Sequence, residues 1–238
     1  MTTRPLSTVL KCFEVLDVMA RQPGPVRISA LGKQLGATRA TTYQRLLTLT
    51  EAGWLERLPD GSYRLSMRAC RVANAALEQA GLGERVRPIL NDLSTQTGES
   101  CSLVLLENTR IVIAQHVEGP GWLRADPGIG AALSFKDSAS GRVWLAFGPE
   151  DLGPRLRNMG EDIPSKEELL AVKADGMAVG GGGETLQGIS VVAVPILDRA
   201  HRCVASISLV CPATRFELDN ILQPLKAAAT RIAALQEG

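Results

Sequence analysis

Apolar residues in the first 53 positions recur at helical spacing in three successive stretches. The first stretch ends at the segment RQPGP, residues 21–25, because proline and glycine continue a helix only at a cost. The second is short and ends at Gly36, and the third, rich in leucine, ends at Gly53. The side chains expected to cap the starts of these helices are those of Ser7, Ser29 and Thr38.

After the third helix the pattern changes to alternation, in the stretch WLERLPDGSYRLS. Strand-like pieces at 54–57 and 62–65 flank Asp60-Gly61, and Asp-Gly between alternating residues is a strong hairpin signal. Three helices followed by a two-stranded wing are the order of a winged helix-turn-helix, in which two helices joined by a small turn present the second one to DNA. The alternative is a small helical packing module whose polar helix face is simply solvated.

A winged helix-turn-helix would place the third helix in the DNA major groove with its first turns foremost. Hydroxyl, phenol and guanidinium groups at that end can reach phosphates and base edges, and Arg45, one turn further along, is expected to touch the DNA backbone. The residues predicted to contact DNA are Thr38, Arg39, Thr41, Thr42, Tyr43 and Arg45 on the helix, and Arg64 on the wing.

Charge is distributed unevenly along the 238 residues, although the net charge is only +1. Residues 1–80 hold 11 Lys and Arg against 6 Asp and Glu, and the acidic excess lies in residues 81–238. The basic part is therefore the one expected to approach a polyanion. No apolar run is long enough for a membrane span, and the N-terminus has no signal-peptide pattern. Five scattered cysteines indicate reduced thiols in a cytoplasmic protein.

Residues 66–80, SMRACRVANAALEQA, are rich in alanine and predict a helix. This helix is interpreted as a linker that can pack against a copy of itself in a dimer, and the alternative is an ordinary surface helix. The predicted domains are residues 1–65, a winged helix-turn-helix; residues 66–80, the linker helix; and residues 81–238, an effector-binding and oligomerisation domain.

The remainder of the chain mixes strand and helix patterns, which predicts an α+β fold with helices packed on an antiparallel sheet. Glycines 180–183 are expected to form a loop, and a kink or frayed turn is expected at Pro224 near the start of the last helix. Strands are expected at 101–106 and 111–116, around a turn at 107–109, and at 189–197 and 203–211, which should pair as a hairpin. Helices are expected at 84–97, at 138–147, from 165, with Ser165 as its cap, and from 217 onward.

A search for catalytic and metal-binding patterns finds little. The two histidines, His116 and His201, have no partners at metal-ligand spacing, and the glycine run lacks the lysine and serine of a phosphate-binding loop. No nucleophile elbow precedes a helix, although a hydrolase centred on Ser140 without an assigned base stays open. We therefore expect no enzyme, no catalytic residue, no metal and no cofactor.

The segment 138–141, SASG, opens a predicted helix whose free N–H groups and hydroxyls can hold a carboxylate. Ser208 lies between apolar neighbours on a predicted strand and is a possible polar handle in a small-molecule pocket. The alternatives are ordinary capping at Ser138 and a hydrogen-bonded core serine at position 208.

Three segments resemble the IclR family of bacterial transcription regulators, and together they span nearly the whole chain. They are LGATRATTYQRLLTLTEAGWL followed by YRLS, then SFKDSASGRVWLAF, then GISVVAVPILDRAHRCVASISLVCPATRF. The resemblance implies a ligand-responsive regulator with a winged helix-turn-helix, a linker helix and a GAF-like/profilin-like ligand-binding domain. It also implies a homodimer or tetramer on double-stranded operator DNA, and a small-molecule effector that is often an organic or aromatic acid. An architectural DNA-binding protein without an effector, or an enzyme with a DNA-binding module, are the alternatives.

The resemblance also implies ligand-binding positions, which in this chain are Ala139, Ser140, Val191, Ser208 and Val210. Relatives that bind small polar acids carry cysteine at the Val191 position, serine at the Val210 position and a carboxylate near Gly181. Valine at both positions adds apolar surface, so a larger effector, such as an aromatic acid or a derivative of one, is expected. In the third helix, Gln44 stands where the family has arginine, and Cys211 replaces a usual glycine.

Overall fold

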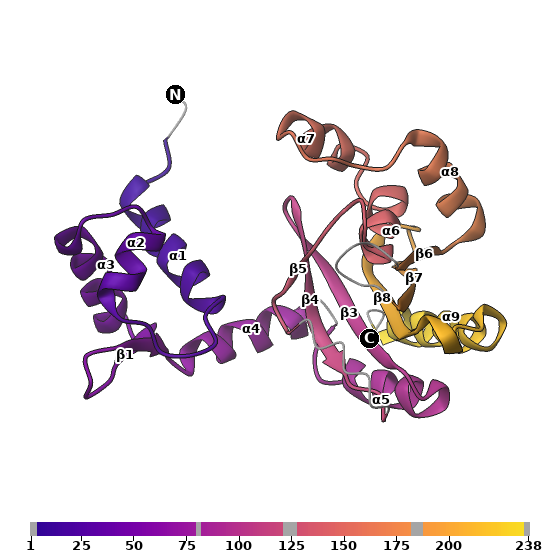
Figure 1. The fold of residues 1–238 in the computed structure, drawn as a ribbon, viewed down its shortest axis with the longest axis horizontal. Coiled ribbons are helices and arrows are strands. Elements are labelled where there is room, and N and C mark those ends of the chain that lie inside the picture. The colour runs from indigo at the N-terminus through magenta and orange to yellow at the C-terminus, as the bar shows by residue number, and fades with distance from the viewer. Residues whose placement is uncertain (1–3, 80–81, 121–127, 182–187, 236–238) are drawn as a thin grey trace. The chain divides into compact units, whose positions relative to one another are not determined.

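The computed structural model describes residues 4–79, 82–120, 128–181 and 188–235 (Figure 1). The chain divides into two compact units, residues 1–77 and 78–238, and each is described by itself. The division falls inside helix α4 (Arg68–Gln79), which lies within the range predicted for the linker. The domain boundaries at 65/66 and 80/81, and the linker role of this helix, stay predictions, and Gly81 lies outside the described residues.

The first unit is the predicted winged helix-turn-helix, and this part of the fold prediction is confirmed. Helices α1 (Ser7–Ala20), α2 (Ile28–Gln34) and α3 (Arg39–Glu51) precede a hairpin of β1 (Leu55–Arg57) and β2 (Tyr63–Leu65). The buried core of this unit includes Val15, Leu31, Leu46 and Leu55. Burial of these side chains fixes α3 by one face only, and its other face remains outside the core.

In the first unit the helix starts agree with the predicted caps in one case out of three. Thr38 caps α3, since its side chain accepts a hydrogen bond from the backbone N–H of Thr41. The predictions for Ser7 and Ser29 are wrong, because the N-cap positions are Leu6 and Arg27, without a side-chain cap. The start of α2 follows a backbone bridge between Val26 and Tyr63, which exchange two hydrogen bonds of 2.8 and 2.9 Å, so tertiary pairing sets this boundary.

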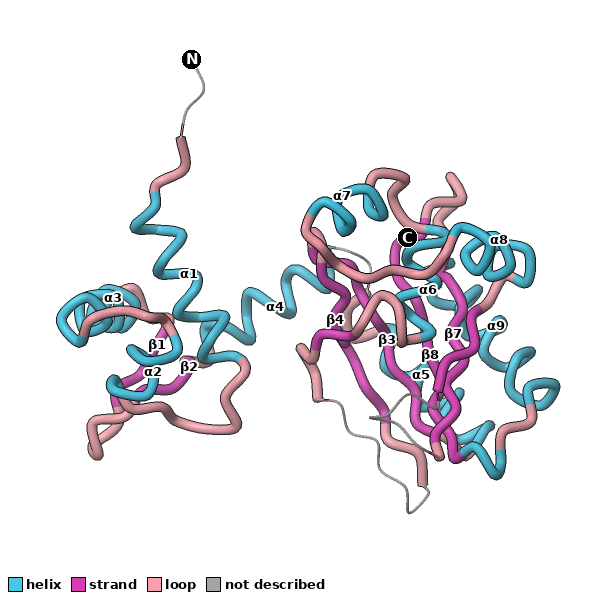
Figure 2. The backbone as a smooth tube through the Cα atoms, turned by 45° about the horizontal axis from the view of Figure 1, so that its top comes forward, coloured by secondary structure: helices cyan, strands magenta, loops and turns pink. Residues whose placement is uncertain are grey.

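The second unit is built on an antiparallel sheet whose described strands lie in the order β5-β4-β3-β8-β7-β6. Figure 2 shows the four long strands β4, β3, β8 and β7 side by side. The bounds are β3 Ser100–Glu107, β4 Arg110–Val117, β5 Ala132–Leu133, β6 Ala178–Gly181, β7 Ile189–Leu197 and β8 Cys203–Pro212. The helices are α5 Val86–Thr97, α6 Ala139–Phe147, α7 Leu152–Asn158, α8 Lys166–Asp175 and α9 Leu218–Leu235, with a 3₁₀ turn at Ala213–Arg215.

The two faces of this sheet are covered by different helices. Cys101 faces α5, since its thiol lies 3.3 Å from the carbonyl oxygen of Leu90, and α9 packs beside α5. Successive strand residues point to opposite faces, so Ser102 faces the other way. That side is the one on which α6 packs, through a cluster that includes Ala139, Val143 and Ala193. The predicted α+β class, an antiparallel sheet with packed helices, is confirmed.

Three short elements of the second unit were not expected from the sequence: β5, α7 and β6. The prediction of a loop at glycines 180–183 is wrong for Gly180 and Gly181, which belong to β6, and the other two glycines lie outside the described residues. A Cβ atom added to Gly180 would lie 2.9 Å from the backbone nitrogen of Ala139, so glycine lets this strand approach α6. Helix α9 continues through Pro224. No described helix combines the length and the apolar character that crossing a membrane requires.

Candidate functional site

The start of α3 presents most of the predicted DNA contacts to solvent. Thr38, Arg39, Thr41 and Tyr43 are exposed, and Arg45 is half-buried. The hydroxyls of Thr38 and Thr41 lie 3.0 Å apart, beside the N–H groups that open the helix. Unpaired helix N–H groups together with these donors form an arrangement suited to phosphate oxygens.

Thr42 lies elsewhere than the prediction placed it. It is fully buried, and its hydroxyl donates to the Thr38 carbonyl at 2.9 Å. A Cβ atom added to Gly32 of α2 would lie only 3.2 Å from this hydroxyl, which shows how closely the two helices approach. A side chain occluded between α2 and α3 cannot touch DNA, so Thr42 is removed from the proposed contacts. The helical period explains the difference, because Thr42 shares the inner face with Leu46 and Leu49.

Replacing Thr42 with valine should lower the stability of the first unit by about 1 kcal/mol, because the shape is kept and one buried hydrogen bond is lost. Operator affinity of the folded protein should stay within twofold of the wild type. Urea unfolding and fluorescence-anisotropy titration measure the two quantities. The matched control is Thr48→Val, whose hydroxyl makes the same bond, to the Gln44 carbonyl at 2.9 Å, but on the exposed side. A tenfold loss of DNA affinity in Thr42→Val alone would return this residue to the contact set.

Arg64 on the wing is exposed but already paired. Its guanidinium lies 2.8 Å from the carboxylate of Glu56, the residue directly opposite on β1. Since both side chains are about half exposed, this pair contributes little to stability. A phosphate would have to compete with Glu56 for the same guanidinium, so Arg64 is a weaker candidate than Arg39.

Leu47, an exposed side chain on α3, was not among the residues predicted from the sequence to contact DNA. Tyr43 and Leu47 lie one helical turn apart and are 46% and 45% exposed, unusually high for a tyrosine and a leucine on one helix face. Gln44 is exposed between them. Apolar groups in the major groove contact thymine methyl groups, and glutamine can pair with adenine, so this face combines both kinds of readout. The i, i+4 spacing of Tyr43 and Leu47 was the available signal.

The five predicted ligand-binding residues come together on the α6 side of the second unit. Val191 of β7 and Val210 of β8 are direct cross-strand partners, and Ser208 lies two residues along β8 on the same face. Ala139 packs in the cluster to which Val191 contributes. Ser140 is 1% exposed and lies on the sheet-facing side of α6, one turn before Trp144, whose indole N–H donates to a β3 carbonyl. Their role in binding a ligand stays a prediction.

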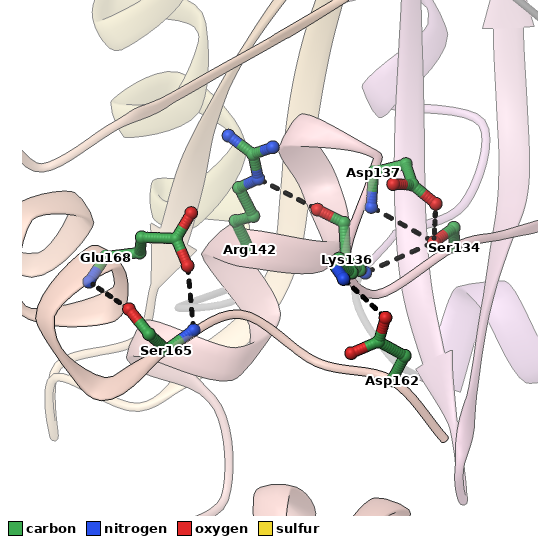
Figure 3. A network of polar contacts seen from close by, with 7 residues as sticks. All are labelled: Ser134, Lys136, Asp137, Arg142, Asp162, Ser165 and Glu168. Atoms are coloured by element: carbon green, nitrogen blue, oxygen red, sulfur yellow. Dashed lines mark hydrogen bonds and ion pairs between the residues drawn. The ribbon is translucent and has the colours of Figure 1, made fainter. Parts of the chain in front are cut away.

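The start of α6 is held by a network of polar contacts (Figure 3). Ser138 caps the helix by accepting from the N–H of Gly141 at 2.9 Å. Arg142 donates to the carbonyl of Lys136 at 2.9 Å and to that of Val179 in β6 at 3.2 Å, which ties the helix to both neighbouring segments. Lys136 forms an ion pair with Asp162 that is also a hydrogen bond, and this hydrogen bond raises the pKa of the Lys136 side chain.

Helix α8 joins this network through its own cap, as Figure 3 also shows. Ser165 and Glu168 form a reciprocal capping box, with hydrogen bonds of 2.8 and 3.2 Å, which confirms the predicted cap at Ser165. The bond from the Ser165 backbone N–H lowers the pKa of the Glu168 carboxyl, with a further contribution from Arg142. The segments on three sides of the α6 start are therefore fixed before any ligand arrives, which favours a preorganised site.

A polar pair on the same sheet face was not predicted from the sequence. The Ser102 hydroxyl lies 2.9 Å from Nδ1 of His116, across the β3–β4 ladder. Nε2 of His116 and the hydroxyls of Ser140 and Ser206 are buried and have no hydrogen-bond partner in the described part of the chain. Polar atoms of this kind usually meet water or a ligand. The alternating serines of β3 and β8, separated by apolar residues, were the overlooked signal.

The cysteines offer no reactive group on this face. Burial raises the pKa of the Cys101 and Cys203 thiols to about 12 and that of Cys211 to about 11, so all three are protonated at neutral pH. Protonated thiols are poor nucleophiles and poor metal ligands. In residues 4–79, 82–120, 128–181 and 188–235, no three His, Cys, Asp or Glu side chains are grouped to hold a metal ion.

Comparisons with known proteins cover both units. Residues 74–234 match the family model "Bacterial transcriptional regulator IclR C-terminal", and residues 8–59 match the "IclR helix-turn-helix domain". The chain is 27% identical over 234 residues to the probable transcriptional regulator SauR of Cupriavidus necator, an alignment that covers 93% of this chain and 92% of that protein.

Solved structures of other proteins share the fold. An IclR transcriptional regulator from Alicyclobacillus acidocaldarius superposes with a TM-score of 0.84 at 22% identity, covering 98% of this chain and 100% of that one. An IclR homologue from Microbacterium hydrocarbonoxydans, complexed with 4-hydroxybenzoate, gives a TM-score of 0.79 at 20% identity, covering 97% and 99%. At 22% and 20% sequence identity these structures establish the fold of this chain. They do not establish its ligand, which depends on its own residues.

Proposed function

The chain belongs to the IclR family of bacterial transcriptional regulators, and from this membership we propose that it controls a catabolic operon in response to a small organic or aromatic acid. The family assignment makes it a ligand-responsive, DNA-binding regulator and not an enzyme. What is proposed is the class of effector, the type of operon, the assembly and the residues that make the contacts. A cytoplasmic location forms part of this proposal, because the operator is chromosomal DNA.

The observation that supports an aromatic or similarly bulky acid is the pairing of Val191 with Val210 next to Ala139. Two valines and an alanine line the sheet face where the α6 start offers N–H groups and the Ser140 hydroxyl. Such a combination suits a ligand with one acidic end and an apolar body. The apolar residues contact the body of the ligand, and the few polar groups fix its orientation. The IclR homologue that binds 4-hydroxybenzoate is consistent with this class.

We propose that the protein is a homodimer that can pair into a tetramer on its operator. Large apolar side chains within or directly before α1 and α4 are exposed in the single chain, among them Leu6 at 73%, Phe13 at 52%, Met67 at 75% and Val72 at 49%. Exposed apolar side chains on neighbouring helices are typical of surfaces that a partner covers. Two winged helix-turn-helix units would then read the half-sites of an imperfect palindrome. Sedimentation with and without operator DNA distinguishes a dimer from a tetramer.

Effector and operator binding are expected to be coupled by about 1–3 kcal/mol. Calorimetry with benzoate, 4-hydroxybenzoate, glyoxylate and pyruvate should show tightest binding among the aromatic acids, and the bound acid should change operator affinity. By reciprocity, an acid that weakens operator binding must bind less tightly to the DNA complex. Tighter binding of the two- or three-carbon acids would overturn the proposed effector class, while leaving the family membership untouched.

A further inference from the structure

A row of residues crosses the α6-facing side of the sheet from β4 to β7. His116 is the direct partner of Ser102, Ser102 pairs with Ser208, and Ser208 pairs with Ala193. Directly opposite residues of an antiparallel sheet share one face, so the four side chains form a continuous strip. Ala193 lies in the cluster of Ala139, so the strip connects the start of α6 with His116.

His116 is held at one nitrogen and unpaired at the other. Its Nδ1 lies 2.9 Å from the hydroxyl of Ser102, a residue that is only 3% exposed and therefore fixed in place. Its Nε2 is buried without a partner among the residues that the structure describes. When the hydroxyl donates to Nδ1, the proton of the neutral ring lies on Nε2, which then points a donor at whatever occupies the face. A buried donor left unpaired is costly, which favours an acceptor from a ligand.

The surroundings of Nε2 restrict the chemistry of that acceptor. On the α6-facing side, the described positions of β3, β4, β7 and β8 carry serine, alanine, valine, isoleucine, leucine, proline and one cysteine besides His116. No lysine or arginine is there to balance a second carboxylate or a phosphate, and burying an uncompensated anion is expensive. A hydroxyl or another uncharged oxygen meets the donor without that cost.

The length of the strip also limits the ligand. Ala193 and His116 are three inter-strand spacings apart, about 14 Å. A two- or three-carbon acid is too short to place one oxygen near the Ala193 end of the strip, beside the start of α6, and another at Nε2 of His116. A ring with oxygen groups on opposite sides places them farther apart.

We infer that His116, oriented by Ser102, selects effectors that carry an uncharged oxygen group at the end remote from their carboxylate. This inference rests on the proposed function, in which the carboxylate lies at the start of α6, and it adds a specificity-determining residue. Ser102 is a positioning residue that acts through the imidazole. The effector class becomes hydroxy-substituted aromatic acids in preference to the unsubstituted acids.

The test uses the full-length protein and two probes, 4-hydroxybenzoate and benzoate, which differ only by the hydroxyl. Isothermal titration calorimetry of the wild type should give at least tenfold tighter binding of 4-hydroxybenzoate. In His116→Leu the affinity for 4-hydroxybenzoate should fall about tenfold and that for benzoate should change less than twofold, so the selectivity disappears. His116→Gln, which retains a hydrogen-bonding group, should recover part of it, and Ser102→Ala should lose selectivity in the same direction but to a smaller extent.

The matched control is the chain's other histidine, His201, in the exposed turn between β7 and β8. His201→Asn keeps a residue that tolerates the positive φ of 56° and should leave both affinities unchanged. Equal losses for the two acids in His116→Leu, or selectivity that survives it, would overturn the role of His116 while leaving the proposed function in place. If neither acid binds to the wild type, the proposed effector class fails, and the inference falls with it.

Discussion

Arg39→Ala should weaken operator binding by about tenfold to a hundredfold, or roughly 1–3 kcal/mol. Arg39 is the first residue of α3, immediately after the Thr38 cap, and its side chain is exposed. At that position a guanidinium can reach either a phosphate or a guanine edge, and the helix N–H groups behind it add to the attraction for an anion. Anisotropy titrations against a DNA site selected with the wild-type protein measure the loss.

The salt dependence of the same titrations separates the two kinds of contact. If Arg39 binds phosphate, the slope of log affinity against log salt concentration should become shallower by about 1 for each substituted protomer, on all sequences alike. If it reads a base, the loss should be confined to the selected site. The matched control is Arg21→Ala, an exposed arginine at the end of α1, which should change neither quantity. An Arg39→Ala protein with unchanged affinity and slope would show that this end of α3 does not face DNA.

The features that the sequence predicted correctly are those that local chemistry determines. Thr38 and Ser165 could be identified as caps because each hydroxyl accepts a hydrogen bond from the N–H group three residues further along the chain. The β3–β4 and β7–β8 hairpins follow from alternating residues around short turns, one of which places Asn108 at a φ of 57°. Each of these features is determined by residues that are close to one another in the sequence.

What could not be predicted depends on residues far apart in the chain. Ser29 was a plausible cap, but the bridge between Val26 and Tyr63 fixes where α2 begins. The strand at Gly180 and Gly181 forms against β7 despite the low strand propensity of glycine, because the close approach of α6 requires it.

The same limit applies to the candidate sites. The helical period of α3 was enough to assign Thr42 to the inner face, once Leu46 and Leu49 were recognised as core positions. His116 and Ser102, by contrast, lie 14 residues apart and become neighbours only through the β3–β4 register, which includes an irregularity after Leu103. A one-residue difference in register would have sent His116 to the opposite face. Polar pairs that depend on register are therefore the part of a ligand site that needs the fold.

Gly141→Ala should destabilise the second unit by about 3 kcal/mol, even though alanine is the better helix former by up to about 1 kcal/mol. A Cβ atom at this position would lie 2.3 Å from the carbonyl oxygen of Ser134 and 2.6 Å from the Cα of Phe135. Both are backbone atoms, so no side-chain rotation relieves the overlap. Either α6 moves, which breaks the Ser138 cap on Gly141, or the segment before it moves and displaces the buried Phe135.

The matched control for this substitution is Gly153→Ala in α7, where the nearest atoms lie 3.9 and 4.0 Å from the added Cβ. That distance is ordinary van der Waals contact, and alanine's helix preference is offset by the following Pro154, which disfavours a helical backbone at a non-glycine residue. This variant should therefore stay within about 1 kcal/mol of the wild-type stability. Differential scanning calorimetry of the full chain, with and without a bound aromatic acid, compares the two. Because Gly141 lets the start of α6 pack closely on the Ser134–Phe135 segment, its substitution should weaken ligand binding as well as stability. If Gly141→Ala unfolds at the same temperature as the wild type and binds the acid equally well, α6 has room to move. A preorganised ligand site at the start of α6 would then be untenable.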